Sequence, residues 1–282
     1  MILDGKALAT KIKTELKEEV ANLTLAHNKT PKLAVVIVGN DPASCVYVRN
    51  KKNACAFCGI ESVSVELDEN TTQQKLESTL KNLNNDQTIN GILLQLPLPK
   101  HLNERDALNC ISAEKDVDGL GKENLGKLLT QEDGLVACTP SGVMELFKEY
   151  NIELSGKNVV IINRSILVGR PLSALLTNAN ATVTVCHSKT KNVEFYTQNA
   201  DIVITAVGKK DFLTANMVKE NAVVIDVSIV RTESGLCGDA KFDELKNKVG
   251  YITPVPGGVG PLTIAMLLKN TVKAFKTQNN IN

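Results

Sequence analysis

The sequence lacks several features that would assign a protein class at once. The net charge of the 282 residues is only +1, so no overall positive field attracts nucleic acid or an anionic membrane. No apolar run reaches the length of a membrane span, and the first twenty residues are amphipathic, unlike a signal or transit peptide. We therefore expect a cytoplasmic protein that binds neither nucleic acid nor a membrane.

Cysteine and histidine do not form a recognisable metal or redox site. Cys55 and Cys58 have Cys-X-X-Cys spacing, but no second pair accompanies them and the three histidines are scattered. The pair also falls near the end of a predicted helix, whereas a redox pair gains its acidity at a helix N-terminus. We expect buried, reduced thiols here and no metal site.

Apolar runs that alternate with helical patterns dominate the rest of the chain. Buried strands are predicted at 32–39, 62–67 and 91–99, with helices between them, and this order implies a parallel sheet. A second alternating series begins at Thr139, which we take as a helix N-cap, and runs to about residue 257. The sequence therefore predicts an α/β fold with two α/β domains.

The domain boundaries follow from these two series. We expect one domain over 1–138, completed by a C-terminal helix over 258–282, and a second domain over 139–257. The second reads as a Rossmann-like, doubly wound parallel sheet. Two such domains would leave a cleft between them, and small-molecule sites commonly form in such clefts.

The segment VVIINRSILVGRPLSALL (159–176) reads as a strand, a turn and a helix. Its turn has one glycine, Gly169, where a dinucleotide-binding fingerprint has three. A helix N-terminus can still hold phosphate through free backbone N–H groups. On this segment alone, a nucleotide site and an ordinary turn both stay open.

The next strand favours one nucleotide. It ends in CHSKTKN, without the carboxylate that accepts from the ribose 2′-OH in NAD-binding domains. Arg164 and Ser188, with Lys189 nearby, would instead surround a 2′-phosphate, although a solvated loop charge is the alternative for Lys189. The predicted cofactor is NADP.

Four polar residues in the first half are candidates for a second site. Tyr47 and Lys51 are four apart on a predicted helix and share a face. Gln95 ends a predicted parallel strand, and Asp118 lies in a polar loop. The alternatives are a lysine that merely covers a tyrosine ring and a carboxylate that caps its own turn.

Taken together, these motifs resemble a known family. YVRNKK, GILLQLPLP, EKDVDGL, CTPSG, RSILVGRP, CHSKT and TPVPGGVGP occur in the order found in bifunctional methylenetetrahydrofolate dehydrogenase/methenyltetrahydrofolate cyclohydrolases. The resemblance covers essentially the whole chain. It implies NADP-dependent oxidation of methylenetetrahydrofolate and hydrolysis of the methenyl product to formyltetrahydrofolate, in one-carbon metabolism. It also implies a homodimer in which the nucleotide domain supplies the contact.

The resemblance implies a role for each candidate. Asp118 would orient the pterin, Tyr47 would stack on the folate, and Lys51, held by Gln95, would act as a base. The folate would also be bordered by Gly257, Gly258 and Pro261. The expected cofactor contacts are Asn163, Arg164, Ser165, Ser188, Gly208 and Ile229.

The chain departs from the family pattern at four positions. Asn163 and Ser228 replace glycines, Asn53 replaces a lysine, and Val230 replaces an asparagine. We expect intact chemistry with altered cofactor affinity. Two other functions stay open: a monofunctional NADP-dependent dehydrogenase of another small substrate, and a non-catalytic NADP- or folate-binding protein.

Overall fold

The chain forms two compact units in the computed structural model, which describes residues 1–233 and 235–281, with Ala43 through its backbone alone. The N-terminal unit comprises Lys11–Cys138 and Ile264–Asn282, and the central unit comprises Met1–Thr10 and Thr139–Thr263. The predicted α/β class with two domains is confirmed. The first ten residues lie in the central unit, whereas the sequence placed them with the first domain.

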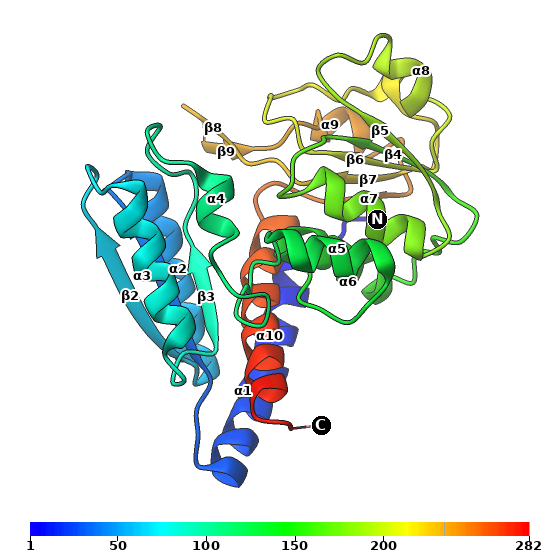
Figure 1. Ribbon diagram of the computed structural model, residues 1–282. Coiled ribbons are helices and arrows are strands. Elements are labelled where there is room, and N and C mark those ends of the chain that lie inside the picture. Colours follow the sequence, from blue (N-terminus) through cyan, green and yellow to red (C-terminus); the bar gives the residue numbers. More distant parts are fainter. Residues whose placement is uncertain (234, 282) are drawn as a thin grey trace. The chain divides into compact units, whose positions relative to one another are not determined.

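The N-terminal unit contains a three-stranded parallel sheet in the order β2-β1-β3 (Figure 1). The strands are β1 (Lys32–Val38), β2 (Glu61–Leu67) and β3 (Gly91–Leu94), joined by α2 (Pro42–Cys58) and α3 (Gln73–Asn85). Because β1 lies in the middle, its two neighbours lie on either side of a topological switch point. Ligands commonly bind at the carboxyl ends of strands at such a point.

Helices supply the rest of the N-terminal unit. The first twenty residues were predicted to be amphipathic, and the helix α1 (Gly5–His27) agrees with this. Four apolar residues spaced four apart along it are all buried: Leu8, Ile12, Leu16 and Val20. The C-terminal helix α10 (Val259–Gln278) packs apolar side chains such as Phe275 into the core. Both helices cross the division between the units. The remaining helices are α4 (Glu104–Leu108) and α5 (Lys122–Thr130).

The central unit contains a five-stranded parallel sheet in the order β10-β7-β6-β4-β5. These strands are β4 (Asn158–Ile162), β5 (Thr182–Cys186), β6 (Ile202–Thr205), β7 (Val223–Asp226) and β10 (Tyr251–Ile252). The strand order reverses at β4, as in a doubly wound fold. Separately, β8 (Val230–Thr232) pairs antiparallel with β9 (Gly235–Cys237). The helical segments are α6 (Cys138–Glu149), α7 (Gly169–Asn178), α8 (Val193–Thr197), η1 (Ala215–Met217) and α9 (Phe242–Leu245).

Two local expectations were wrong. The helix α6 begins at Cys138, so Thr139 lies inside the helix and does not cap it. The Thr139 hydroxyl instead shares a hydrogen bond with the hydroxyl of Thr263, at 2.9 Å. The strand expected over 91–99 ends at Leu94, before two prolines that cannot donate to a sheet.

Among the residues that the structure describes, no helix is both long and apolar enough to cross a bilayer.

The most unusual core residue of the N-terminal unit is Lys115, which is only 3% exposed. Its Nζ donates to the carbonyl oxygens of Asn84 at 2.7 Å, Asp86 at 2.8 Å and Leu83 at 3.3 Å. These carbonyls lie at the C-terminal end of α3, where a positive charge is favourable.

Replacing this lysine should weaken the unit. Lys115→Met keeps the side-chain volume but leaves the carbonyls at the end of α3 without their donor. We expect a loss of about 2–4 kcal/mol in the free energy of unfolding, measured by urea denaturation. The exposed Lys100 is the matched control, and Lys100→Met should change stability by less than about 0.5 kcal/mol. Equal stability of the two variants would contradict a capping role for Lys115.

Candidate active site

The helix α2 presents two of the predicted residues. Asp41 caps its N-terminus by accepting a hydrogen bond from the amide of Ser44 at 2.8 Å, and Pro42 occupies its first turn. Tyr47 and Lys51 lie one turn apart on this helix, as the sequence predicted. The Tyr47 side chain is 42% exposed, so its ring can still be covered by a ligand.

Gln95 fixes the position of the Lys51 amine. Its backbone amide donates to the carbonyl of Val36 at 2.8 Å, which attaches the residue after β3 to β1. Its side-chain Nε2 donates to the carbonyl of Leu96 at 2.6 Å, and its Oε1 accepts from Lys51 Nζ at 2.9 Å. The carboxamide is therefore oriented so that its oxygen faces the amine.

The surroundings of Lys51 favour its neutral form. Burial lowers the pKa of the amine, while the negative charge of Asp118 acts in the opposite direction, as would ionised Cys138 and Cys55. Burial by the protein's own residues is therefore sufficient to lower the pKa of Lys51.

The loop that carries Asp118 contains two aspartates, and the structure shows which of them caps the turn. Asp116, not Asp118, caps this turn: its carboxylate accepts from the amides of Leu120 at 3.3 Å and Gly121 at 2.8 Å. It also accepts from the side chain of Asn124 at 3.0 Å. Asp118 is therefore not the capping carboxylate of this turn. It lies close enough to Lys51 for their charges to interact.

Two thiols near the amine were not predicted as part of the site. The Sγ of Cys138 donates to the carbonyl of Val117 at 3.3 Å, and the thiol also contacts Asp118. Burial raises the pKa of Cys138 well above its usual value and that of Cys55 to about 12, so both stay neutral. Cys55 and Cys58 are fully buried and unbridged, as expected. Cys138 belongs to the CTPSG motif, but no local pattern marked it as part of the site, because its contacts lie outside its own helix.

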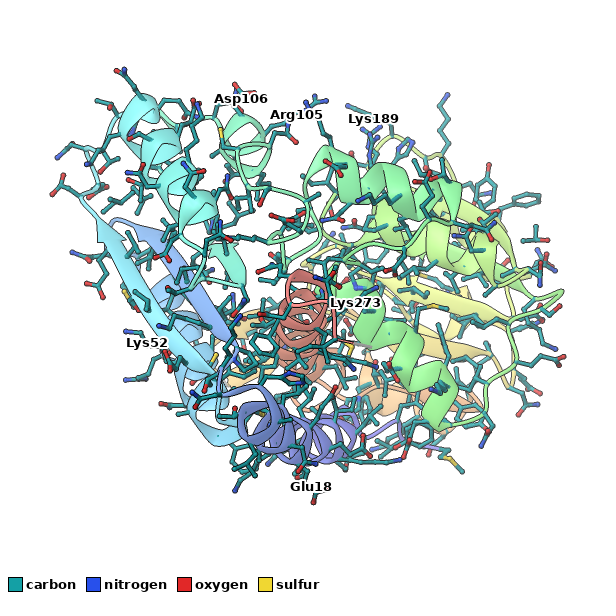
Figure 2. All side chains as sticks on the ribbon, turned by 60° about the horizontal axis from the view of Figure 1, so that its bottom comes forward. Glu18, Lys52, Arg105, Asp106, Lys189 and Lys273 are labelled. Atoms are coloured by element: carbon teal, nitrogen blue, oxygen red, sulfur yellow. The ribbon has the colours of Figure 1, made fainter. Side chains whose placement is uncertain are left out.

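The predicted nucleotide contacts lie at the carboxyl ends of adjacent strands. Ile162 of β4 pairs with Cys186 of β5, and Arg164 and Ser188 each follow two residues later. Both are exposed, and so is Lys189, labelled in Figure 2. The register of the sheet therefore places the arginine and the serine at neighbouring strand ends.

Asn163 organises the turn before α7. Its Oδ1 accepts from the Ser165 amide at 2.7 Å, the Ser165 hydroxyl at 2.8 Å and the Gly169 amide at 3.0 Å. The amide of Arg170 donates to the carbonyl of Ser165 at 3.0 Å, and Pro171 has no amide hydrogen. The expectation of free N–H groups was therefore wrong for the first three residues of α7. A phosphate at this turn would depend chiefly on side chains.

A second loop of the central unit is built around the fully buried Asp239. Its carboxylate accepts from the amides of Val207 at 2.6 Å and Lys209 at 2.7 Å. The hydroxyl of Ser228 donates to Asp239 at 2.7 Å and accepts from the Gly208 amide at 3.0 Å. Ser228, which replaces a family glycine, thus ties Gly208 in place. Ile229, another expected cofactor contact, is 45% exposed.

The glycines of the PVPGGVGP segment have packing roles. Gly257 has a φ of +107°, and its carbonyl accepts from the amide of Lys6 at 2.8 Å. A Cβ on Gly258 would lie 2.5 Å from the carbonyl oxygen of Pro254, which no side chain tolerates. A contact of Gly257, Gly258 or Pro261 with folate stays a prediction.

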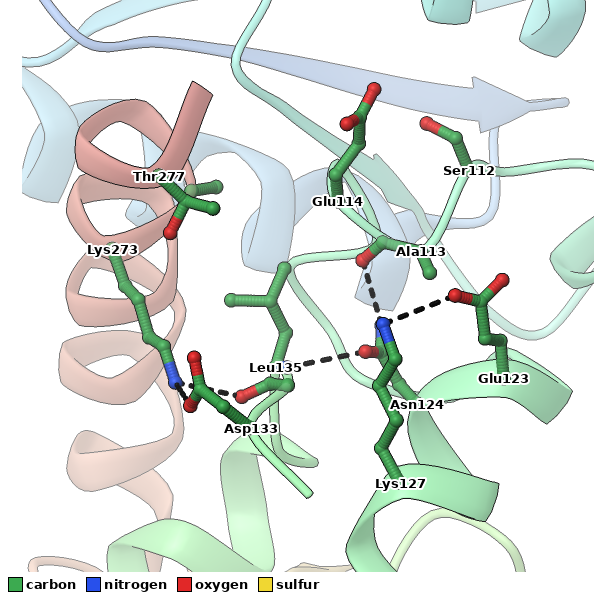
Figure 3. A pocket seen from close by; sticks show the side chains of 12 residues that line it. Ser112, Ala113, Glu114, Glu123, Asn124, Lys127, Asp133, Leu135, Lys273 and Thr277 are labelled. Atoms are coloured by element: carbon green, nitrogen blue, oxygen red, sulfur yellow. Dashed lines mark hydrogen bonds and ion pairs between the residues drawn. The ribbon is translucent and has the colours of Figure 1, made fainter. Parts of the chain in front are cut away.

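A pocket in the N-terminal unit lies apart from the predicted residues (Figure 3). It is lined by residues 112–114, 123, 124, 127 and 133–135 and by α10. Four of its charged side chains form two ion pairs, Lys127 with Glu123 at 3.1 Å and Lys273 with Asp133. Tyr47, Lys51, Gln95 and Asp118 do not line this pocket.

Two family models match the chain. Residues 3–118 match the catalytic domain of tetrahydrofolate dehydrogenase/cyclohydrolase, and residues 137–279 match its NAD(P)-binding domain. The chain is 54% identical over 278 residues to the bifunctional protein FolD of Campylobacter hominis, with 98% of each chain covered. It is 51% identical to that of Agathobacter rectalis, covering 98% of this chain and 99% of the relative.

Solved structures agree with these matches. The FolD methylenetetrahydrofolate dehydrogenase/cyclohydrolase of Campylobacter jejuni is 50% identical with a TM-score of 0.96, covering 98% of this chain and 99% of that one. The Trypanosoma brucei enzyme, solved with NADP and an inhibitor, is 41% identical with a TM-score of 0.94, covering 98% and 97%. The family predicted from the motifs is confirmed: the chain belongs to the tetrahydrofolate dehydrogenase/cyclohydrolase family.

Proposed function

We propose that this protein oxidises methylenetetrahydrofolate with NADP and then hydrolyses the methenyl product to formyltetrahydrofolate. Membership of the family supports this pair of reactions. The observation that carries the proposal is the 2.9 Å hydrogen bond from Lys51 Nζ to Gln95 Oε1, with Asp118 beside the amine. A partly buried amine with a lowered pKa is more readily found in the neutral form that accepts a proton.

The folate is held by the residues around this amine. Asp118 accepts paired hydrogen bonds from the pterin amino group and ring N–H, which fixes the orientation of the ring. Tyr47 supplies an exposed aromatic face on which the folate stacks. In the central unit, Gly257 and Gly258 have no side chain to keep a ligand from the backbone, and we propose that they and Pro261 also border the folate.

Lys51 activates water for the hydrolysis step. Its neutral amine accepts a proton from the water that attacks the methenyl carbon, and Gln95 Oε1 holds the amine in place by accepting a hydrogen bond from it. The preceding oxidation needs no protein base, because NADP, when bound, accepts a hydride. For that step the residues around Lys51 contribute orientation.

NADP is held by the strand ends of the central unit. Arg164 and Ser188 bind the 2′-phosphate, since they leave the paired strands β4 and β5 at equivalent positions. Asn163 and Ser165 shape the turn through their mutual hydrogen bonds. Gly208 and Ile229 lie in loops that follow β6 and β7, on the same edge of the sheet.

The division of labour follows the domains. Residues 1–138 with the helix over 258–282 bind folate and carry out the proton transfer, and residues 139–257 bind NADP.

The protein acts as a cytoplasmic homodimer. The edge strand β5, with Val185 36% exposed, and the nearby helix α8, with Phe195 62% exposed, offer apolar surface for the contact. A monomeric mass by light scattering would contradict the dimer.

Removing the amine should separate the two reactions. Lys51→Met keeps most of the side-chain length, and we expect cyclohydrolase activity to fall by about 10²–10⁴-fold because water loses its base. Dehydrogenase activity should fall less, so methenyltetrahydrofolate should accumulate in an absorbance assay. The adjacent Lys52, labelled in Figure 2, is the control, and Lys52→Met should retain both rates. Parental hydrolysis by Lys51→Met would refute the assignment.

Removing the arginine should affect one nucleotide only. Arg164→Ala deletes a charge-assisted contact of about 1.5–3 kcal/mol, so the KM for NADP should rise roughly tenfold or more. The KM for NAD should barely change, because NAD has no 2′-phosphate. Lys191→Ala, at an exposed position in the neighbouring loop, should leave both constants unchanged. Equal losses with NADP and NAD would show that Arg164 supports the turn and does not recognise the phosphate.

A further inference from the structure

One side chain of α10 holds the backbone next to Asp118. The Nδ2 of Asn270 donates to the carbonyl oxygens of Val117 and Val136, each at 2.8 Å. The same nitrogen lies 3.7 Å from the Sγ of Cys138. A single amide group therefore joins two loop segments that are well separated in the sequence, and one of them carries Asp118.

The hydrogen bond to Val117 acts directly on the geometry of Asp118. The Val117 carbonyl belongs to the same planar peptide group as the backbone nitrogen of Asp118. A hydrogen bond that fixes this carbonyl therefore also fixes the orientation of the peptide plane that leads into Asp118. The segments are also closely packed: a Cβ on Gly119 would lie 2.5 Å from the carbonyl carbon of Val136.

A neighbouring residue of α10 makes a comparable contact that does not reach Asp118. Lys273, one turn after Asn270, donates to the carbonyl of Gly134 at 2.9 Å and pairs with Asp133 (Figure 3). Both side chains therefore fix the segment 133–136 on α10. The bond to Val117 distinguishes Asn270 from Lys273.

We propose that Asn270 is a positioning residue for folate binding, acting through the Val117 carbonyl to orient Asp118. The proposal rests on the function proposed above, in which Asp118 binds the pterin. The side chain of Asn270 does not itself meet the reacting atoms. Its loss should weaken folate binding in both reactions equally, because both use the same bound pterin.

The test compares Asn270→Leu, which is similar in size but lacks the donor, with Lys273→Met. We expect Asn270→Leu to raise the KM for methylenetetrahydrofolate about tenfold, with less change in kcat and none in the KM for NADP. Lys273→Met should leave all three constants unchanged. Hydrogen exchange of the amides over 117–121 should accelerate in Asn270→Leu and not in Lys273→Met. Asn270→Ala provides the same comparison if the leucine variant folds poorly.

The outcomes separate this proposal from the proposed function. A parental KM for methylenetetrahydrofolate in Asn270→Leu overturns the positioning role, as does an equal rise in Lys273→Met. Inactivity of the parent protein on folate instead refutes the proposed function. In that case the exchange rates still decide whether Asn270 holds the Asp118 loop, since unchanged exchange in Asn270→Leu shows that it does not.

Discussion

Burying an amine costs free energy unless the amine has a hydrogen-bond acceptor. In this protein the side chain of Gln95 supplies that acceptor for Lys51. The bond can form only where the helix α2 and the end of β3 bring the two residues together. The carboxamide of Gln95 is turned toward the amine by its own bond to Leu96. Lys51 thus combines a fixed position with a lowered pKa, the two properties that a general base requires.

The same geometric rule places the candidate groups of both units. In each sheet the strands run parallel, so the residues that follow them gather at one edge. Gln95 follows β3 in the N-terminal unit, while Arg164 and Ser188 follow β4 and β5 in the central unit. Strand polarity therefore decides which polar residues become available for chemistry, and the buried aliphatic strands hold them there.

Much of this arrangement could be predicted from local patterns. Apolar runs and helical spacing identified the strands and placed Tyr47 and Lys51 on one helix face, because both signals extend over only a few residues. The rest depends on contacts between distant parts of the chain. Asn270 lies 153 residues from Val117, so no periodicity could indicate their hydrogen bond.

The turn at Asn163 was misjudged for a related reason. Its sequence suggested open helix amides, whereas the structure shows the side chain of Asn163 occupying two backbone donors of that segment. Asp116 and Asp118 could likewise not be distinguished by sequence. Their roles follow from which carboxylate faces the amides of residues 120 and 121.

The central claim is that this one chain carries out both reactions, with Lys51 serving the second. The most direct measurement is to mix the protein with methylenetetrahydrofolate and NADP and follow the absorbance of NADPH and of methenyltetrahydrofolate together. We predict that NADPH forms while methenyltetrahydrofolate appears only transiently. The account is contradicted if folate and NADP bind without turnover, if the protein is inactive on folate, or if methenyltetrahydrofolate accumulates in proportion to NADPH and decays no faster than without protein.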